Sequence, residues 1–214
     1  GVNAFRNNSM LTRITLSGAT NEIQAYGMYN MHNLMTIDFI GYSQLTYINE
    51  YAFAGCVSLT SWSFPEMLLS IGDYAFSGIN GRPMALRNIS FGNRLEAIGD
   101  YAFNDCTLLS SARIPSSVIT IGEGAFKNCR QMLLEIDVDG SRLTEIGDYA
   151  FYGCYNTRTV YLPSSLISLG DYAFSAPEDE SLFMQLTTVA IVSDISGVRR
   201  LERIGKGAFK NCIY

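Results

Sequence analysis

Ile98-Gly-Asp-Tyr-Ala-Phe103 is a six-residue motif that returns unchanged at Ile71–Phe76 and at Ile146–Phe151. The separations between successive copies are 23, 25, 23, 27, 23, 25, 23 and 35 residues. A nearly fixed period of this length indicates stacked structural repeats, each of which buries its apolar face against its neighbours. The remaining copies of this IGDYAF motif are degenerate and end at Phe5, Met28, Phe53, Phe126, Phe174 and Phe209.

A second pattern, L-x-x-I-x-L in idealised form, lies between successive IGDYAF motifs. Its last two apolar positions are spaced by two and are often β-branched or aromatic, which is typical of a strand with one buried face. The pattern therefore predicts eight short strands in one parallel sheet. The predicted strand positions are Leu11/Ile14/Leu16, Leu34/Ile37/Phe39, Leu59/Trp62/Phe64, Leu86/Ile89/Phe91, Leu109/Ala112/Ile114, Leu133/Ile136/Val138, Thr157/Val160/Leu162 and Leu186/Val189/Ile191.

The IGDYAF motif itself is interpreted as a short helical turn. Its glycine permits a bend, and its alanine and phenylalanine would point inward and form a buried row of Phe side chains. An acidic residue follows the glycine in most copies and could accept the free backbone N–H groups at the start of the turn. Lys206 replaces this residue in the last copy, so its turn is expected to be the least well capped. The acidic residues are Asp73, Asp100, Glu123, Asp148 and Asp171.

The combined pattern L-x-x-I-x-L-P-x-x-L-x-x-I-G-x-x-A-F-x-x-C resembles the BspA-like, or Treponema-type, leucine-rich repeat. The resemblance implies an α/β, right-handed solenoid with a parallel concave sheet and short helical turns on the opposite side. It covers nearly the whole chain and predicts one domain over residues 1–214 with about eight repeats. Residues 174–209 are irregular because two segments there are longer than in the other repeats, and we expect them to leave the stack as loops.

The composition excludes several function classes. The net charge is −5, and Lys and Arg are scattered, which disfavours a nucleic-acid partner because phosphate binding needs a clustered basic face. No apolar stretch is long enough to span a bilayer, so no membrane insertion is expected in this segment, and no export signal is recognisable.

Catalytic and metal chemistry is also disfavoured. All five cysteines lie three residues after the last residue of an IGDYAF motif, which indicates a packing position rather than a zinc or catalytic thiol site. A disulfide between consecutive coils is the alternative for Cys106, Cys129 and Cys154. His32 is the only histidine and has no evident triad partners, and Glu135 with Asp137 is interpreted as a solvated face rather than an acid/base pair. We therefore predict no enzyme activity and no cofactor.

Two surfaces remain as candidate binding sites. The tyrosines of the motif recur at one offset and could form an aromatic binding stripe, although repeat packing explains them as well. The side chains that flank the central apolar residue of each strand should point away from the core, and their variety is what a recognition surface allows. The candidate concave face consists of Arg13, Thr15, Thr36, Asp38, Ser61, Ser63, Asn88, Ser90, Ser111, Arg113, Glu135, Asp137, Thr159, Tyr161 and Thr188.

The family resemblance implies a cell-surface or secreted module, hence an extracellular location, that adheres to a protein ligand such as a host matrix or cell-surface protein. The irregular residues 175–200 are expected to contact the partner together with the candidate concave face. A structural spacer or scaffold arm of a larger protein is the alternative function. The chain shows no polar capping segment at either end, which predicts either further repeats or end-to-end self-association.

Overall fold

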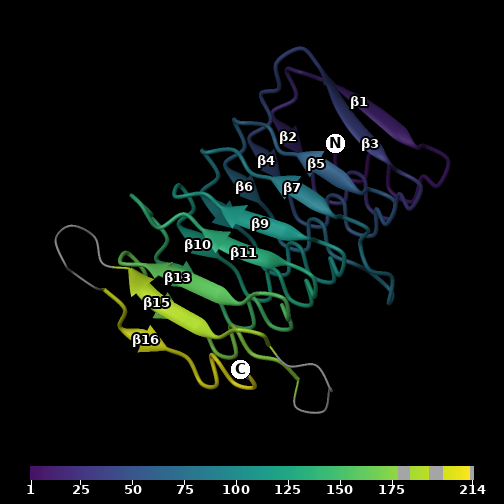
Figure 1. Ribbon diagram of the computed structural model, residues 1–214. Coiled ribbons are helices and arrows are strands. Elements are labelled where there is room, and N and C mark those ends of the chain that lie inside the picture. The colour runs from purple at the N-terminus through teal and green to yellow at the C-terminus, as the bar shows by residue number, and fades with distance from the viewer. Residues whose placement is uncertain (178–183, 193–199, 213–214) are drawn as a thin grey trace.

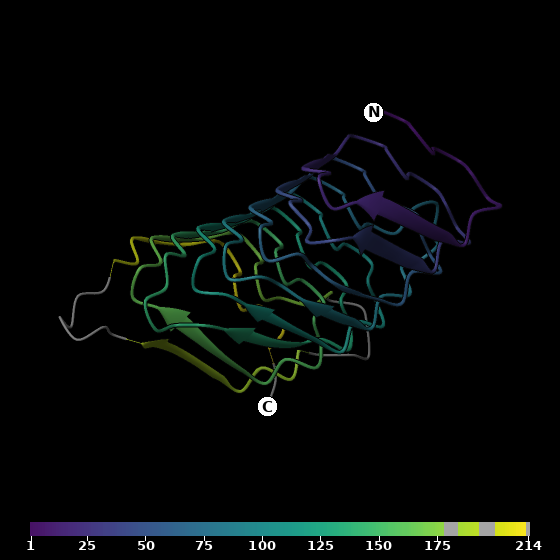
Figure 2. The same ribbon diagram turned by 90° about the horizontal axis from the view of Figure 1, so that it is seen from above.

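The computed structural model describes residues 1–177, 184–192 and 200–212. The chain winds as a solenoid in which each complete coil contributes one strand to each of two sides. Figures 1 and 2 show the longer strands on one side of the stack and two-residue strands on the opposite side, with the hydrophobic core between them. The predicted leucine-rich-repeat solenoid is confirmed.

The longer strands coincide with the eight predicted L-x-x-I-x-L segments and are parallel. They do not form the single sheet expected from the sequence, because backbone pairing joins them into three separate ladders, β1-β3, β5-β7-β9-β11 and β13-β15. These strands are β1 (Arg13–Ser17), β3 (Thr36–Ile40), β5 (Ser61–Ser63), β7 (Asn88–Ser90), β9 (Ser111–Ile114), β11 (Leu133–Ile136), β13 (Thr159–Pro163) and β15 (Thr188–Val192).

A second sheet runs along the opposite side without interruption and was not predicted. Each of its eight strands has only two residues, and the second is the first residue of an IGDYAF motif. Such a short strand has no periodicity that a sequence pattern could reveal. The strands are β2 (Glu22–Ile23), β4 (Tyr47–Ile48), β6 (Ser70–Ile71), β8 (Ala97–Ile98), β10 (Thr120–Ile121), β12 (Glu145–Ile146), β14 (Ser168–Leu169) and β16 (Arg203–Ile204).

The predicted helical turns were wrong, since the described part of the chain contains no helix. Alternate N–H groups of the motif donate hydrogen bonds to the next coil. Tyr101 N–H donates to Glu123 C=O and Phe103 N–H to Ala125 C=O, each at 2.7 Å. The N–H groups between them close local turns, as that of Ala102 does with a C=O three residues earlier. The motif tyrosine also has a left-handed backbone, with φ +52° at Tyr101, which a right-handed helix cannot contain. Hydrogen bonds between stacked coils therefore take the place of hydrogen bonds within a helix.

The aspartates of the motif cap the next coil rather than their own turn, whereas Glu123 accepts the Tyr101 hydroxyl. Asp73 Oδ1 accepts the N–H of Asp100 at 2.8 Å, and Asp100 Oδ1 accepts the N–H of Glu123 at the same distance. Asp171 Oδ1 caps Lys206 N at 2.9 Å, so the expectation of a poorly capped turn at Lys206 was wrong. A lysine in this position affects only a coil that would follow it.

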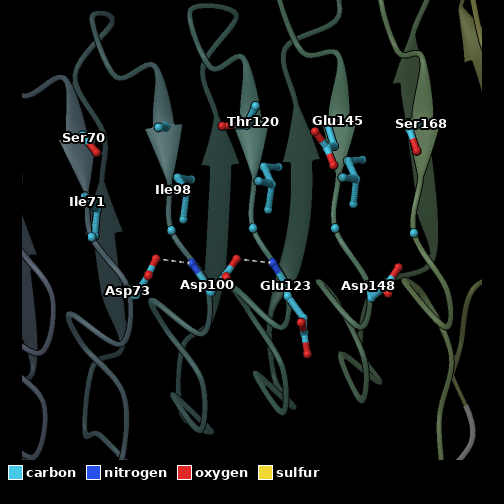
Figure 3. A pocket seen from close by; sticks show the side chains of 18 of the residues that line it. Ser70, Ile71, Asp73, Ile98, Asp100, Thr120, Glu123, Glu145, Asp148 and Ser168 are labelled. Carbon is cyan, nitrogen blue, oxygen red and sulfur yellow. Dashed lines mark hydrogen bonds between the residues drawn. The ribbon is translucent and has the colours of Figure 1, made fainter.

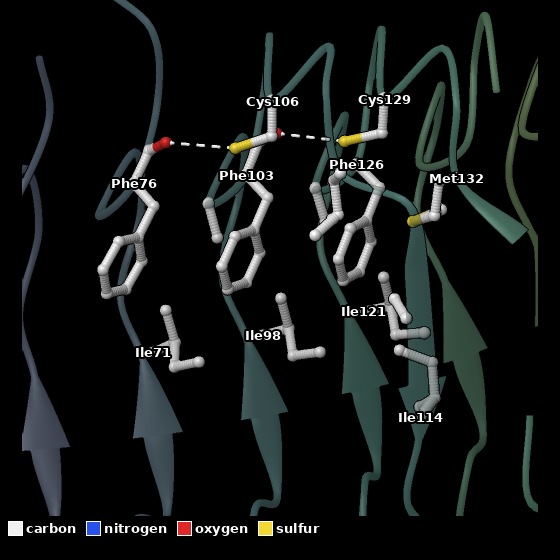
Figure 4. Close-up of a cluster of buried hydrophobic side chains, with 14 of the residues drawn as sticks. Ile71, Phe76, Ile98, Phe103, Cys106, Ile114, Ile121, Phe126, Cys129 and Met132 are labelled. Carbon is white, nitrogen blue, oxygen red and sulfur yellow. Dashed lines mark hydrogen bonds between the residues drawn. The ribbon is translucent and has the colours of Figure 1, made fainter. Parts of the chain in front are cut away.

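The predicted row of motif phenylalanines is confirmed as the centre of the core. Phe76, Phe103 and Phe126 are completely buried, and their rings stack with centroids 5.1–5.3 Å apart and planes within 6°. Figure 4 shows these three rings above the isoleucines that begin the same motifs. The buried side chains form one cluster that extends from Ile14 to Ala208, so neighbouring coils share a continuous core.

The predicted register was wrong in β11. Leu134 pairs with Ala112 and Ile136 with Ile114, two residues away from the predicted Ile136 and Val138. This repeat has one residue fewer before the strand and carries its extra residues after it. Leu133 is consequently 51% exposed instead of buried.

The irregular region and the two ends bear on the remaining predictions. Residues 178–183 and 193–199, where loops were expected, lie outside the described residues. Val2 and Ile204 are each 59% exposed, in the first and last coils. Apolar surface is thus open at both ends of the stack, and end-to-end association stays a prediction.

Candidate functional site

The candidate face on the longer strands is open to solvent. Of the fifteen predicted residues, Thr36, Asp137 and Thr159 are half-buried and the others are exposed. The strand pleat explains this result, since the same strands bury their alternate side chains, such as Ile14 and Val160. Asp137 lies beyond the end of β11, and Leu133, which the sequence analysis placed in the core, points outward on that strand.

Charges on this face form pairs between neighbouring coils. Arg113 Nη2 lies 2.7 Å from Asp137 Oδ1, and Arg113 Nη1 lies 3.8 Å from Glu135 Oε1. Arg13 Nε lies 3.4 Å from Asp38 Oδ2 on the β1-β3 ladder. The arginine side chains are about two-thirds exposed, so these pairs contribute little to stability and remain available to a partner.

Exposed apolar side chains lie beside the charged ones. Leu133 on β11 is 51% exposed and Tyr161 on β13 is 52% exposed. Next to them, a hollow of about 690 Å³ is lined by residues of β11, the loop after it and β13. The mixture of an aromatic, an aliphatic and paired charges is typical of protein-binding surfaces, in which few side chains contribute most of the affinity.

A different hollow of about 690 Å³ lies over the sheet of two-residue strands (Figure 3). Glycines of the motif form its floor, and the capping carboxylates lie along one side. Among these, Asp73 and Asp100 each use one oxygen for a backbone N–H of the next coil. No group of three potential metal ligands occurs in the described ranges. The hydrogen bonds of Asp73 and Asp100 give these two carboxylates a structural role, because each of them joins two neighbouring coils.

The comparisons with known proteins agree with this architecture. The whole chain, as residues 1–82 and 82–214, matches the BspA type leucine rich repeat region with 6 copies. The chain belongs to the BspA-type leucine-rich repeat family. No curated protein matches it.

Solved structures of several bacterial proteins share this fold. A leucine-rich repeat protein of Treponema pallidum is 28% identical, with a TM-score of 0.63 over 73% of this chain and 69% of that one. A leucine-rich cell surface protein of Faecalibacterium prausnitzii is 20% identical, with a TM-score of 0.55 over 100% of this chain and 68% of that one. A leucine-rich repeat protein of Bacteroides ovatus is 19% identical, with a TM-score of 0.60, covering 99% and 67% of the two chains.

The tyrosines of the IGDYAF motif pack against one another. The rings of Tyr51 and Tyr74 stack with centroids 4.7 Å apart, and those of Tyr74 and Tyr101 with centroids 5.0 Å apart. Gly124 interrupts the stack, and Lys127 Nζ lies 6.0 Å from the Tyr101 ring centroid at this point. Partial burial raises the pKa of Tyr101, and its hydrogen bond to Glu123 raises it further. Because ring faces contact each other, packing explains this row without a ligand.

The motif cysteines are free thiols that donate hydrogen bonds to the preceding coil. Cys106 Sγ lies 3.5 Å from Phe76 C=O and Cys129 Sγ lies 3.3 Å from Phe103 C=O, as Figure 4 shows. Burial raises the pKa of Cys129 and raises that of Cys56 to about 12. Their thiols are therefore protonated at neutral pH and inert, because the thiolate is the reactive form.

Thiol labelling should distinguish Cys212 from the other four cysteines. Its side chain is only half-buried, and burial raises its pKa to about 11. In native protein at pH 8 we expect an aromatic disulfide reagent to label Cys212 first and the buried thiols only after unfolding. The rate at Cys212 should rise with pH toward its pKa. Peptide mapping after timed quenching measures this order, and early labelling of Cys129 would contradict it.

His32 takes part in the stack through its backbone. His32 is half-buried, and its C=O accepts the Ser58 hydroxyl at 2.6 Å, so its backbone joins two coils. In the described ranges, no helix has the length and apolar character needed to cross a bilayer.

Proposed function

We propose that this BspA-type chain is a non-catalytic protein-binding module whose partner contacts the face of the longer strands. One observation carries the proposal: on this face neighbouring coils present different exposed side chains, although the repeat imposes near-identity at the packed positions. Packing therefore does not account for the residues found there. A large area of small polar groups, with Leu133 and Tyr161 as exposed apolar positions, suits an extended contact better than a deep small-molecule pocket.

An extracellular or cell-surface location, with a host matrix or cell-surface protein as partner, is part of the same proposal. Its support is analogy to proteins of the same fold, among them the leucine-rich cell surface protein of Faecalibacterium prausnitzii and the pneumococcal vaccine antigen PcpA. A structural arm is the second candidate function. The uninterrupted ladder of eight two-residue strands and the stacked Phe row would stiffen such an arm.

The test uses a panel of purified extracellular-matrix proteins and the double variant Arg113→Glu/Asp137→Lys. The variant keeps an ion pair across the two coils, so the fold should be unaffected, while the charges offered to a partner are inverted. We expect at least about tenfold weaker binding of any partner identified, equivalent to about 1.4 kcal/mol. Surface plasmon resonance measures the affinity.

Glu145→Lys provides the matched control, because Glu145 is exposed on the opposite sheet. It should leave the affinity within about twofold. A partner that binds the double variant normally but loses affinity for Glu145→Lys would place the interface on the opposite side. Failure of every matrix protein to bind at micromolar concentration would favour the structural arm.

A further inference from the structure

The sheet of longer strands is split between β3 and β5. The coils that carry these two strands remain paired on the opposite side, where β4 and β6 are hydrogen-bonded neighbours. In Figure 2 the purple and blue strands at the N-terminal end are set apart from the teal strands that follow. β11 and β13 also lack a ladder, but their backbones stay close together, whereas the backbones of β3 and β5 lie farther apart. The stack is therefore splayed at this one place among the described longer strands.

Splaying leaves two strand edges that face each other. In a parallel ladder, alternate residues direct their backbone groups to one neighbour. β3 directs Ile40 C=O to Gly18 in the first coil, at 2.8 Å, so its residues Ile37 and Phe39 face the gap. β5 uses Phe64 N–H for a bond to Ser90 C=O at 3.0 Å, on its other side. Ser61 and Ser63 consequently offer their N–H and C=O groups to the gap.

A hollow of about 680 Å³ lies over this gap and is lined by residues of β3, β5 and β7, so it also extends across β5 to its paired neighbour. Its apolar floor includes Ile37 and the nearly buried Trp62, and hydroxyl groups line its rim. Asp38 is the only charged residue in the lining, and it is paired with Arg13 at 3.4 Å. The hollow thus combines unpaired strand edges, an apolar floor and a lining with little net charge.

We propose that this hollow takes an extended, uncharged segment of a partner protein as an added β-strand. The inference rests on the proposed function, since it assigns part of the binding face to one mode of recognition. Backbone hydrogen bonds to the open edges provide the affinity, as in other cases where a peptide adds to a sheet edge. Alternate side chains of the segment face the apolar floor and solvent, so β-branched and polar residues in alternation fit it.

A five-residue model peptide, acetyl-Thr-Val-Thr-Val-Thr-amide, matches the length of β3 and tests the mode directly. Trp62 is the only tryptophan of the chain and forms part of the floor, so its fluorescence reports occupancy. We expect saturable binding with a dissociation constant below about 1 mM. Two isomers N-methylated at alternate residues are the matched ligands, because N-methylation removes donors while adding apolar surface. At least one isomer should bind about tenfold more weakly.

Two variants distinguish peptide binding by the backbone of the strand edge from peptide binding by its side chains. Ser63→Pro removes an edge N–H that faces the gap and should weaken peptide binding about tenfold, while Ser63→Ala should keep it within about threefold. Thermal melts confirm folding, and Ser61→Pro replaces the first variant if that one unfolds. No binding at 5 mM, or equal binding of the peptide and both isomers, would overturn the inference. If a matrix partner still binds and depends on Arg113 and Asp137, the proposed function stands without it.

Discussion

Replacing Phe103 by alanine is expected to lower the free energy of unfolding by roughly 3–5 kcal/mol, the usual range for a core phenylalanine. Phe103 is completely buried, and its ring stacks on Phe76 and Phe126 with centroids 5.3 and 5.1 Å away. Its loss removes apolar surface from three coils at once, and stacked neighbours on both sides cannot collapse into the cavity without breaking their own contacts. Urea unfolding followed by circular dichroism measures the change.

Met10→Ala is the matched control for this prediction, because Met10 is 85% exposed. An exposed position of this kind should change stability by no more than about 0.5 kcal/mol. Phe103→Leu should fall between the two variants. A loss below about 1 kcal/mol for Phe103→Ala would show that the phenylalanine row is not the centre of the core.

The features that could be predicted from the sequence are those that repeat at fixed offsets. The repeat period and the alternation within each L-x-x-I-x-L segment located the longer strands, including the buried Ile14 and the exposed Arg113. The predicted register of β11 was two residues off, because this repeat has one residue fewer before its strand and its extra residues come after it. The register error moved Leu133 from the core to the surface.

The features that could not be predicted depend on neighbouring coils. The motif looked helical because a glycine, an acidic residue and inward apolar residues also fit a short helical turn. In the stack, its alternate N–H groups bond to the next coil, and Asp100 caps Glu123 of that coil. The candidate face followed from strand alternation, but the hollow at the split between β3 and β5 depends on how far two coils separate. No local pattern encodes that distance.

Gly122→Val, a substitution at the glycine of the IGDYAF motif, is expected to lower the free energy of unfolding by roughly 2–4 kcal/mol. A Cβ atom at Gly122 would lie 2.7 Å from the backbone N of Asp100 and from the carbonyl carbon of Gly99, atoms of the preceding coil. Backbone atoms cannot rotate away as the end of a flexible side chain can. The two coils must therefore separate.

Separation of the coils stretches two hydrogen bonds beside the substituted residue. Gly122 N–H donates to Ile98 C=O at 2.8 Å, and Glu123 N–H donates to Asp100 Oδ1 at 2.8 Å. Gly140→Asn is the control, because Gly140 has φ +65° with no atom near its added Cβ, and asparagine tolerates this conformation. It should cost less than about 1 kcal/mol. Denaturant unfolding measures both variants, and amide hydrogen exchange at positions 122 and 123 should accelerate only in the valine variant. Wild-type stability of Gly122→Val would mean that coil spacing does not require glycine here.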